Sequence, residues 1–459
     1  MEWKLTRGRK VAATIVGVAA LGAALTASVA VGKSSAAPIK VAILSDCKGA
    51  FGAFYEQDIG GAQAAFANYA GGKAKDKKKP SKGMTGIKVG GREIKIVGYG
   101  CSDDKAETAL KETRRLMEGL KADILIGPLS GDEGIAVANY AKKHPKQTFL
   151  NGTSGAQDTT LKVRAKNFFR FNSDGAQWSA GLGDYAYSKL GWRKAAVIMD
   201  NYSFAWTSAG GMIAEFCAVG GDMTTRLYPE LGTTDYSTFA RQLPKIGKGA
   251  NDVDGYFVAV GGTGTTAFLK AYEQAVGPID GTKFIGNLFF SDPTQYAELS
   301  DRIAGALASG PTAGDSTSAT AAAYAANVAK VYPGLKANAP SVFLYNYYNA
   351  AWGLIKGLTA TKGDISGAKL WPALSKVTLK GGYGNIKLDA NRNAITDNYV
   401  QQLYKGSDGK LAVKTILRIP AVDQTFGGTF SPSTPAPGQG QPTCTKRSLP
   451  WIGKAQPVN

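Results

Sequence analysis

Short apolar runs alternate with amphipathic helical patterns along most of the chain, and this alternation limits the possible folds more than any other feature. The expected strands lie at 41–44, 94–99, 123–126, 147–150, 195–199, 255–260 and 283–285. Helical patterns lie at 61–70, 105–119, 134–143, 176–190, 208–219, 237–245, 265–276, 318–332 and 345–359. Such alternation predicts parallel sheets that are covered by helices on both faces.

The length of the chain is compatible with two domains of this kind. About 420 residues follow an N-terminal segment that does not belong to the fold, and this suggests two domains of ordinary size. The alternation forms one block before about residue 171 and a second block after it. We therefore predict an α/β fold with two doubly wound, Rossmann-like lobes. The Ser-, Pro- and Gly-rich stretch at 431–442 predicts a flexible tail over 431–459.

The N-terminal segment is typical of an exported protein. Four basic residues in the first ten precede an uncharged apolar run over 11–32, and small residues follow at 34–37. This order predicts a secretory signal over 1–37, cut at Ala36/Ala37 or Ala30/Val31, and a secreted or extracytoplasmic protein. The alternative is an uncleaved membrane anchor, because the run is long enough to span a bilayer.

The net charge is +19, and removing residues 1–37 leaves about +15. The basic residues are scattered, except for the run at 73–82, which falls between a helical pattern and a strand. We interpret that run as a solvated loop, and we expect no nucleic-acid binding. A weak attraction to anionic polymers or membrane surfaces is the more natural consequence of the charge.

The four cysteines fit an oxidising compartment and allow three disulfide connectivities. Cys47 and Cys101 each follow an expected parallel strand, and neighbouring strands would bring them together, so we prefer this pair. Cys217 then pairs with Cys444; the alternative is four free, buried thiols. We expect no metal site, because there is no CxxC motif and His144 is the only histidine.

The turns that follow the expected strands are rich in glycine, hydroxyl and aromatic side chains. They read GAFGAFY at 49–55, GPLSGDE at 127–133, NGTSGAQ at 151–157, DNYSFAW at 200–206, GGTGTT at 261–266 and NLFFSD at 287–292. Ligands of open α/β sheets bind at this end of the strands. Glycines let the backbone approach a ligand, and hydroxyls and helix N-terminal amides donate to it. Each turn alone is equally typical of a plain connection, but together they favour a small organic solute.

Two patterns that would indicate an enzyme are weak or missing. The stretch GTGTTA at 262–267 matches a dinucleotide-binding fingerprint, but no acidic residue ends the next strand. No nucleophile elbow, phosphate-binding loop or HExxH motif is found in the sequence. We therefore predict a binding protein without catalytic residues or cofactor, and nucleotide-dependent catalysis remains the less favoured alternative.

The order of these motifs resembles the type I periplasmic binding proteins of the branched-chain amino acid group, the solute receptors of ABC importers. The resemblance covers roughly residues 39–430. It is carried by IKVAILSD with GAFGAFYEQDIGGAQAAF, ADILIGPLSGDEGIAVANYA, QTFLNGTSGAQD, KAAVIMDNYSFAWTSA, GYFVAVGGTGTTAFLKAY and FIGNLFFSD. It implies two lobes joined by a three-strand hinge, with lobe 1 at 38–170 and 312–392 and lobe 2 at 172–310 and 394–430. Closure of the lobes would trap the solute between them.

The resemblance also implies ligand-binding positions in both lobes. In lobe 1 they are Phe54, Tyr55, Ser130, Gly131, Thr153, Ser154 and Gly155, and in lobe 2 they are Phe204, Trp206, Thr263, Leu288 and Phe289. Leu288 stands where an amino-acid receptor has an acidic residue for the ligand ammonium, and Asp292 is a possible substitute. Because an unpaired ammonium is costly to bury, this difference favours a carboxylate, amide or aromatic solute over a standard amino acid.

The resemblance implies a monomer that delivers its solute to an ABC permease in the membrane. The same fold would also suit an extracellular sensor that signals to a partner, and the sequence does not separate these two functions.

Overall fold

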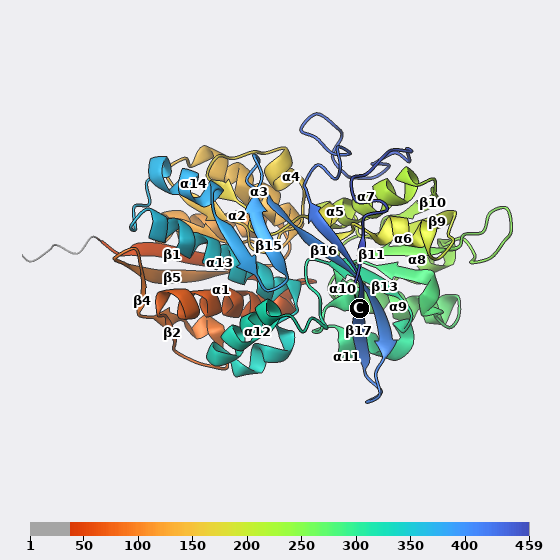
Figure 1. The fold of residues 1–459 in the computed structure, drawn as a ribbon, viewed down its shortest axis with the longest axis horizontal. Helices are drawn as coiled ribbons and strands as arrows, with labels where there is room; N and C mark the ends of the chain where they lie inside the picture. The colour runs from red at the N-terminus through yellow and green to blue at the C-terminus, as the bar shows by residue number, and fades with distance from the viewer. Residues whose placement is uncertain (1–36, 459) are drawn as a thin grey trace, which may run out of the picture. The chain divides into compact units, whose positions relative to one another are not determined.

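The computed structural model describes residues 37–458 (Figure 1), and its first lobe is built on a six-stranded sheet. The strands run in the order β4 (Ile87–Val89), β5 (Arg92–Ser102), β1 (Ile39–Asp46), β6 (Ile124–Ile126), β7 (Thr148–Leu150) and β8 (Phe168–Phe169). All of them are parallel except β4, which pairs antiparallel with β5. The central strand β1 is buried along almost its whole length, as an apolar run between two helical layers should be. The predicted export signal falls outside the described residues, apart from Ala37.

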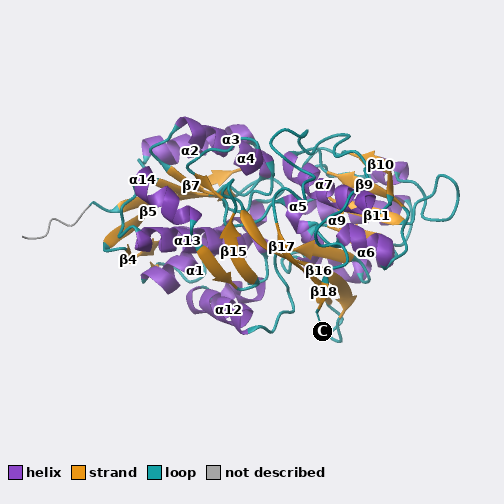
Figure 2. Cartoon of the chain, turned by 45° about the horizontal axis from the view of Figure 1, so that its top comes forward, coloured by secondary structure: helices purple, strands orange, loops and turns teal. Residues whose placement is uncertain are grey.

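Helices cover both faces of this sheet, as the alternating pattern predicted (Figure 2). They are α1 (Tyr55–Ala70), α2 (Ala106–Arg114), α3 (Gly131–Lys143), α4 (Asp158–Leu161) and, from later in the chain, α12 (Ala319–Val331), α13 (Val342–Ala360) and α14 (Gly367–Ser375). The apolar side chains of α1, α12 and α13 form one continuous core with β1. Residues that are distant in sequence therefore complete the first lobe.

The second lobe is built on a larger mixed sheet. Its strands run in the order β10 (Asp222–Leu227), β9 (Lys194–Met199), β11 (Gly255–Ala259), β12 (Phe284–Gly286), β13 (Leu307–Gly310), β16 (Ala394–Lys405), β15 (Gly384–Leu388) and β14 (Thr378–Gly381); β17 (Leu411–Val422) pairs with β16, and β18 (Gln456–Pro457) pairs with β17. The far end of this sheet, β15 and β14, packs on the core of the first lobe. The run from β10 to β13 is parallel, and from β16 onward the pairing is antiparallel. The strands from β13 to β18 were not among the expected elements.

The helices of the second lobe are shorter on average. They are α5 (Gly175–Trp178), α6 (Leu182–Ser188), α7 (Ser203–Ala218), α8 (Ser237–Gln242), α9 (Thr263–Ala275), α10 (Leu288–Ser291) and α11 (Tyr296–Leu299). The single helix expected at 176–190 is divided in two by Gly181, whose φ is +94°. A side chain at this position would come within 3 Å of Val400 and Ile419, so packing against β16 and β17 requires the glycine.

The chain passes between the lobes three times. It leaves the first sheet after β8, returns to the first core after β13, and crosses again into β16. Arg170 and Asn393, which lie next to two of these crossings, form a parallel bridge. This is the three-segment connection that a hinge requires, while the exact lobe boundaries remain a prediction.

Both preferred disulfides are present, with Cα–Cα distances of 5.1 Å for Cys47–Cys101 and for Cys217–Cys444. The first bond joins the ends of β1 and β5, as parallel neighbours predicted. The second attaches the C-terminal segment to α7.

The C-terminal segment is packed, which corrects the expectation of a flexible tail. Trp451 is buried, and its indole N–H donates to Glu215 Oε1 over 2.6 Å. Lys162 Nζ donates to the carbonyl oxygens of Ser431 and Pro432 at 2.8 and 3.2 Å. Composition alone predicted flexibility, whereas a disulfide, a buried indole and these contacts hold the segment on the protein.

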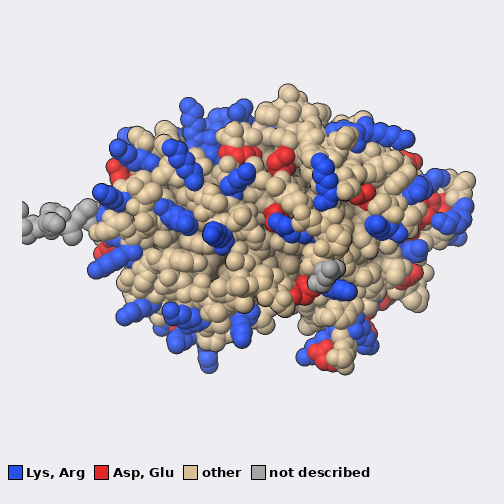
Figure 3. All heavy atoms as spheres, in the orientation of Figure 1, with Lys and Arg blue, Asp and Glu red and all other residues tan. Residues whose placement is uncertain are grey.

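The basic residues are spread over the face seen in Figure 3, with acidic residues between them. The lysine-rich stretch at 73–82 begins in the short strand β2 (Lys73–Ala74) and continues through a loop and a short helical turn towards β3 (Met84–Thr85), and all of its lysines are exposed. This distribution matches the expected solvated loop. Within residues 37–458, no helix has the length and apolar character to cross a membrane.

Candidate functional site

The loop after β1 carries two buried phenylalanines towards the second lobe. Phe51 and Phe54 are each 1% exposed, and the short helical turn η1 (Gly52–Phe54) joins them to α1. Phe54 stacks on Phe343 of α13, with ring centroids 3.7 Å apart. An aromatic pair from two distant parts of the chain therefore forms the lobe 1 wall.

The loops after β6 and β7 supply the polar part of the lobe 1 wall. Gly131 begins α3, and Ser130 directly before it is buried with a hydroxyl that has no hydrogen-bond partner within the described residues. Thr153 and Gly155 follow β7 and are also buried. The first amides of α3 have no acceptor within the helix, so this end of α3 can receive an anionic or carbonyl group.

The facing wall comes from the starts of α7 and α10. Phe204 contacts the ring of Tyr202 at 6.0 Å and that of Trp178 at 5.7 Å, between centroids. Phe289 of α10 lies 6.1 Å from Phe204 and 5.6 Å from Phe343, and it therefore joins the aromatic side chains of both lobes.

A small cavity lies between these walls. Its lining residues are Phe51, Leu129, Gly131, Thr153, Gly155, Trp178, Tyr202, Phe204, Leu288, Phe289 and Phe343. None of these side chains is charged. The cavity volume is about 10 Å³, which is roughly the space of one water molecule. An organic solute can therefore bind only if the lobes separate or the rings move.

The lobes touch each other around this cavity. The Ser203 amide donates to Asp132 Oδ1 at 3.2 Å, and the Thr263 amide donates to the Ala50 carbonyl oxygen at 3.4 Å. Glycines make the approach possible, because a Cβ on Gly131 would lie 2.6 Å from Ser203 Oγ. The described structure is thus a closed form.

The structure brings seven of the twelve expected residues near one another at the cavity. Gly131, Thr153, Gly155, Phe204, Leu288 and Phe289 line it, and Phe54 stacks directly behind it on Phe343. Ser130 precedes the lining residue Gly131 in the chain. These assignments remain predictions of ligand contact, although their positions agree with it.

The other expected residues lie outside the lining. Tyr55 is half-buried on α1, and Ser154 is buried behind the loop, next to Gly134 of α3. Trp206 is two residues beyond Phe204 on α7 and so points about 200° away around the helix. Thr263 lines a different, open hollow with Ala53 and Lys270.

Sequence reasoning missed five lining residues: Phe51, Leu129, Trp178, Tyr202 and Phe343. Phe51, Leu129 and Tyr202 lie within the strand-end turns that were recognised as a group, so the turn signal could have found them. Trp178 and Phe343 belong to helices with no such signal, and only the fold brings them to the cavity.

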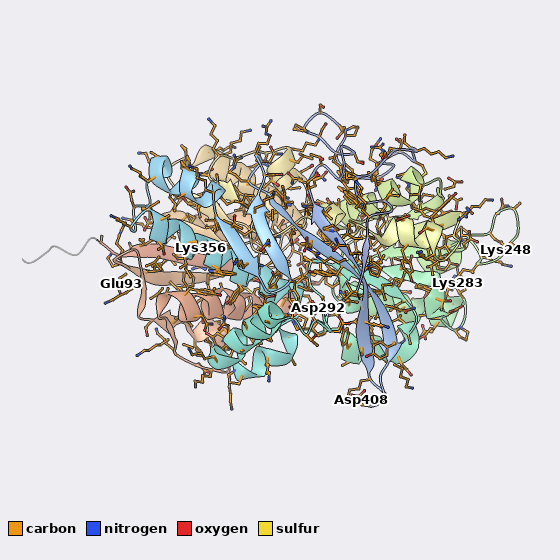
Figure 4. All side chains as sticks on the ribbon, in the orientation of Figure 1. Glu93, Lys248, Lys283, Asp292, Lys356 and Asp408 are labelled. Atoms are coloured by element: carbon orange, nitrogen blue, oxygen red, sulfur yellow. A yellow bond between two sulfur atoms is a disulfide. The ribbon has the colours of Figure 1, made fainter. Side chains whose placement is uncertain are left out.

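Asp292 does not act as a free partner for a ligand ammonium. Its Oδ1 accepts hydrogen bonds from the amide and hydroxyl of Thr294, and its Oδ2 accepts one from Ser341 Oγ at 2.7 Å. Figure 4 shows Asp292 at the junction of the two lobes, where the Ser341 contact joins α13 of lobe 1 to lobe 2. The carboxylate thus has a structural partner, and Leu288 leaves the cavity without an acid.

Buried carboxyl groups surround the site without lining it. Burial, together with the nearby carboxylates of Glu133 and Asp104, raises the pKa of Asp46 well above its ordinary value. Asp104 Oδ2 accepts the Ala50 amide over 2.5 Å, and Glu133 accepts the hydroxyl of Ser102. Within the described residues, no three His, Cys, Asp or Glu side chains are arranged to hold a metal ion.

The buried carboxyl group of Asp200 allows a prediction of how folding stability depends on pH. Burial raises the pKa of Asp200 to about 8, although its oxygens accept hydrogen bonds from the Gly261 amide and the Tyr236 hydroxyl. Unfolded aspartate titrates near pH ~3.9, so only the native protein holds this proton between pH ~4 and ~8, and folding stability falls as pH rises through that range. We expect a higher melting temperature at pH 5 than at pH 8 by calorimetry.

The variant Asp200→Asn should make this pH dependence smaller, because its amide cannot release a proton. The other buried carboxyls act in the same direction and will leave part of the slope. Equal slopes for the wild type and the variant between pH 5 and 8 would contradict this role of Asp200.

Comparison with known proteins agrees with this geometry. The model of a family described as "Periplasmic binding protein" matches residues 38–410. The chain belongs to the periplasmic binding protein family. The family implies an extracytoplasmic location and a function in substrate binding. A comparison with curated protein sequences found no significant match.

Solved structures of other periplasmic binding proteins share the fold at low sequence identity. An ABC transporter solute-binding protein from R. palustris in complex with benzoate has a TM-score of 0.69 and 21% identity, covering 83% of this chain and 96% of that one. A solute-binding protein from Rhodopseudomonas palustris BisB5, in complex with 3,4-dihydroxybenzoic acid, has a TM-score of 0.72 and 19% identity, with coverage of 86% and 99%. A leucine-binding protein from Thermotoga maritima has a TM-score of 0.68 and 17% identity, with coverage of 83% and 99%.

Proposed function

We propose that this periplasmic binding protein is the solute receptor of an ABC importer and that its ligand is a small aromatic carboxylate. The observation that carries the proposal is a cavity between the lobes that is lined by six aromatic side chains and by no charged one. Aromatic rings offer large apolar contact areas, and stacked rings favour a flat ligand. The proposal includes a monomer that delivers the solute to a membrane permease.

A carboxylate has a suitable place beside the rings. Gly131 lines the cavity at the N-terminus of α3, a helix of 13 residues, and the Ser130 hydroxyl there has no hydrogen-bond partner in the described part of the chain. The positive end of a helix dipole and unpaired amides favour an anion. An amino acid would also bring an ammonium, and burying that charge without a paired acid is unfavourable.

The similar solved structures support this ligand class. Two of the proteins compared above bind benzoate and 3,4-dihydroxybenzoic acid, and their fold is similar along almost their whole length. The similar leucine-binding protein shows that the fold also serves amino acids, so the lining of the cavity must decide between the two classes.

A thermal-shift comparison tests the proposal. Benzoate and 4-hydroxybenzoate at concentrations of about 100 times Kd should stabilise the purified protein by about 2.7 kcal/mol, and leucine and isoleucine should not. Small-angle scattering should show a more compact protein with the stabilising acid than without it. Stabilisation by the amino acids but not by the aromatic acids would overturn the ligand class.

A further inference from the structure

Phe51 is presented by an unusually well-held loop. The loop starts at Cys47, which is bonded to Cys101, and its Ala50 amide donates to the buried carboxylate of Asp104 over 2.5 Å. The amides of Cys47 and Lys48 both donate to the Ser102 carbonyl oxygen, at 3.1 and 3.3 Å. A covalent bond and three hydrogen bonds therefore fix the loop on the end of β5.

The ring of Phe51 extends from this loop into lobe 2. It stacks on Phe289 with ring centroids 5.7 Å apart and an interplanar angle of 10°, and its centroid lies 6.1 Å from that of Tyr202. Lobe 2 makes room for the ring with two successive glycines. A Cβ on Gly261 or Gly262 would lie 3.1 or 3.0 Å from atoms of the Phe51 ring.

The Phe51 ring therefore closes one end of the cavity. It lines the cavity and is 1% exposed, and beyond it lie Gly261 and Gly262, which bear no side chain. We propose that Phe51 is the specificity-determining residue that limits the ligand to a single ring, because it occupies the space in which a second fused ring would have to lie. This inference rests on the proposed function and adds an upper limit to the size of the ligand at the same site.

The test compares one-ring and two-ring acids. The probes are benzoate and 2-naphthoate, titrated by calorimetry into the wild type and into Phe51→Ala and Phe51→Leu. An added group in an apolar pocket changes affinity by roughly 10- to 200-fold, so we expect the wild type to prefer benzoate about tenfold or more. Phe51→Ala should reverse this preference, and Phe51→Leu should fall between them. If the alanine variant does not fold, the same comparison can still be made with the leucine variant.

Phe216→Ala is the matched control. It removes the same phenyl ring from the lobe 2 core, where Phe216 is fully buried against Phe257 and does not line the cavity. Its preference for benzoate over naphthoate should equal that of the wild type. An unchanged preference in both Phe51 variants would overturn the proposal.

Titrations with uncharged aromatic ligands distinguish a failure of this inference from a failure of the proposed function. If no variant binds either acid, the carboxylate ligand class fails, and the same comparison with benzene and naphthalene then decides the role of Phe51. A gain of naphthalene binding in Phe51→Ala but not in Phe216→Ala supports the size limit, and its absence refutes it.

Discussion

Replacing Phe204 by alanine is expected to weaken solute binding about 30-fold, whereas Trp206→Ala should leave the affinity within about a factor of two. Phe204 is buried on the lobe 2 wall of the cavity, where its ring contacts the rings of Trp178, Tyr202 and Phe289. Its loss removes apolar contact with the ligand and opens the wall. The measurement is a calorimetric titration with the acid that most stabilises the wild type.

Trp206 is the natural control for this experiment. It is a large aromatic side chain on the same helix, only half-buried and outside the cavity lining. Near-ultraviolet circular dichroism should show that both variants keep a packed core. Equal losses of affinity in the two variants would mean that the lobe 2 wall has been assigned to the wrong face of α7.

The parallel core of each lobe could be predicted from sequence because a strand buried on both faces needs an uninterrupted apolar run. The runs at β1, β9 and β11 have this form, and the turns after them, which are rich in glycine, hydroxyl or aromatic residues, locate the end of the sheets that faces the cavity. The strands β15 and β17 gave no such signal, because their buried residues alternate with partly or fully exposed ones. The strand β16 gave none because its buried run contains the polar residues Asp397, Asn398 and Gln401. Antiparallel strands with one solvated face cannot be recognised by apolar runs alone.

The candidate site could be predicted only as far as local sequence decides it. Phe204 and Trp206 belong to one turn sequence, and only the rotation of α7 sends one side chain into the cavity and the other away from it. Phe343 is the second residue of a helix whose sequence is typical of ordinary core, and its partner Phe54 is almost 290 residues away in the chain. Contacts of this kind depend on how the lobes pack, which no local pattern contains.

Gly262→Ala is expected to prevent full closure of the lobes. Gly262 has φ +54°, and a Cβ there would lie 2.2 Å from the Ala50 carbonyl oxygen of lobe 1. A backbone atom cannot move aside as a flexible side chain can, so the variant must hold the lobes apart. We expect solute affinity to fall about tenfold or more, because a ligand that contacts only one lobe loses the advantage of the closed form.

Small-angle scattering with and without the stabilising acid measures this effect directly. The wild type should become more compact with ligand, and Gly262→Ala should not. Gly277→Ala is the matched control, because Gly277 also has a positive φ, +138°, but an added Cβ would meet nothing within 4 Å. Both substitutions strain the backbone, by roughly 1–3 kcal/mol, so a loss of compaction that appears only in Gly262→Ala is expected to arise from the contact with the loop that carries Ala50 and Phe51. Compaction of Gly262→Ala to the extent of the wild type would show that the loop carrying Ala50 and Phe51 yields on closure, and the rigid wall argued for Phe51 would then be lost as well.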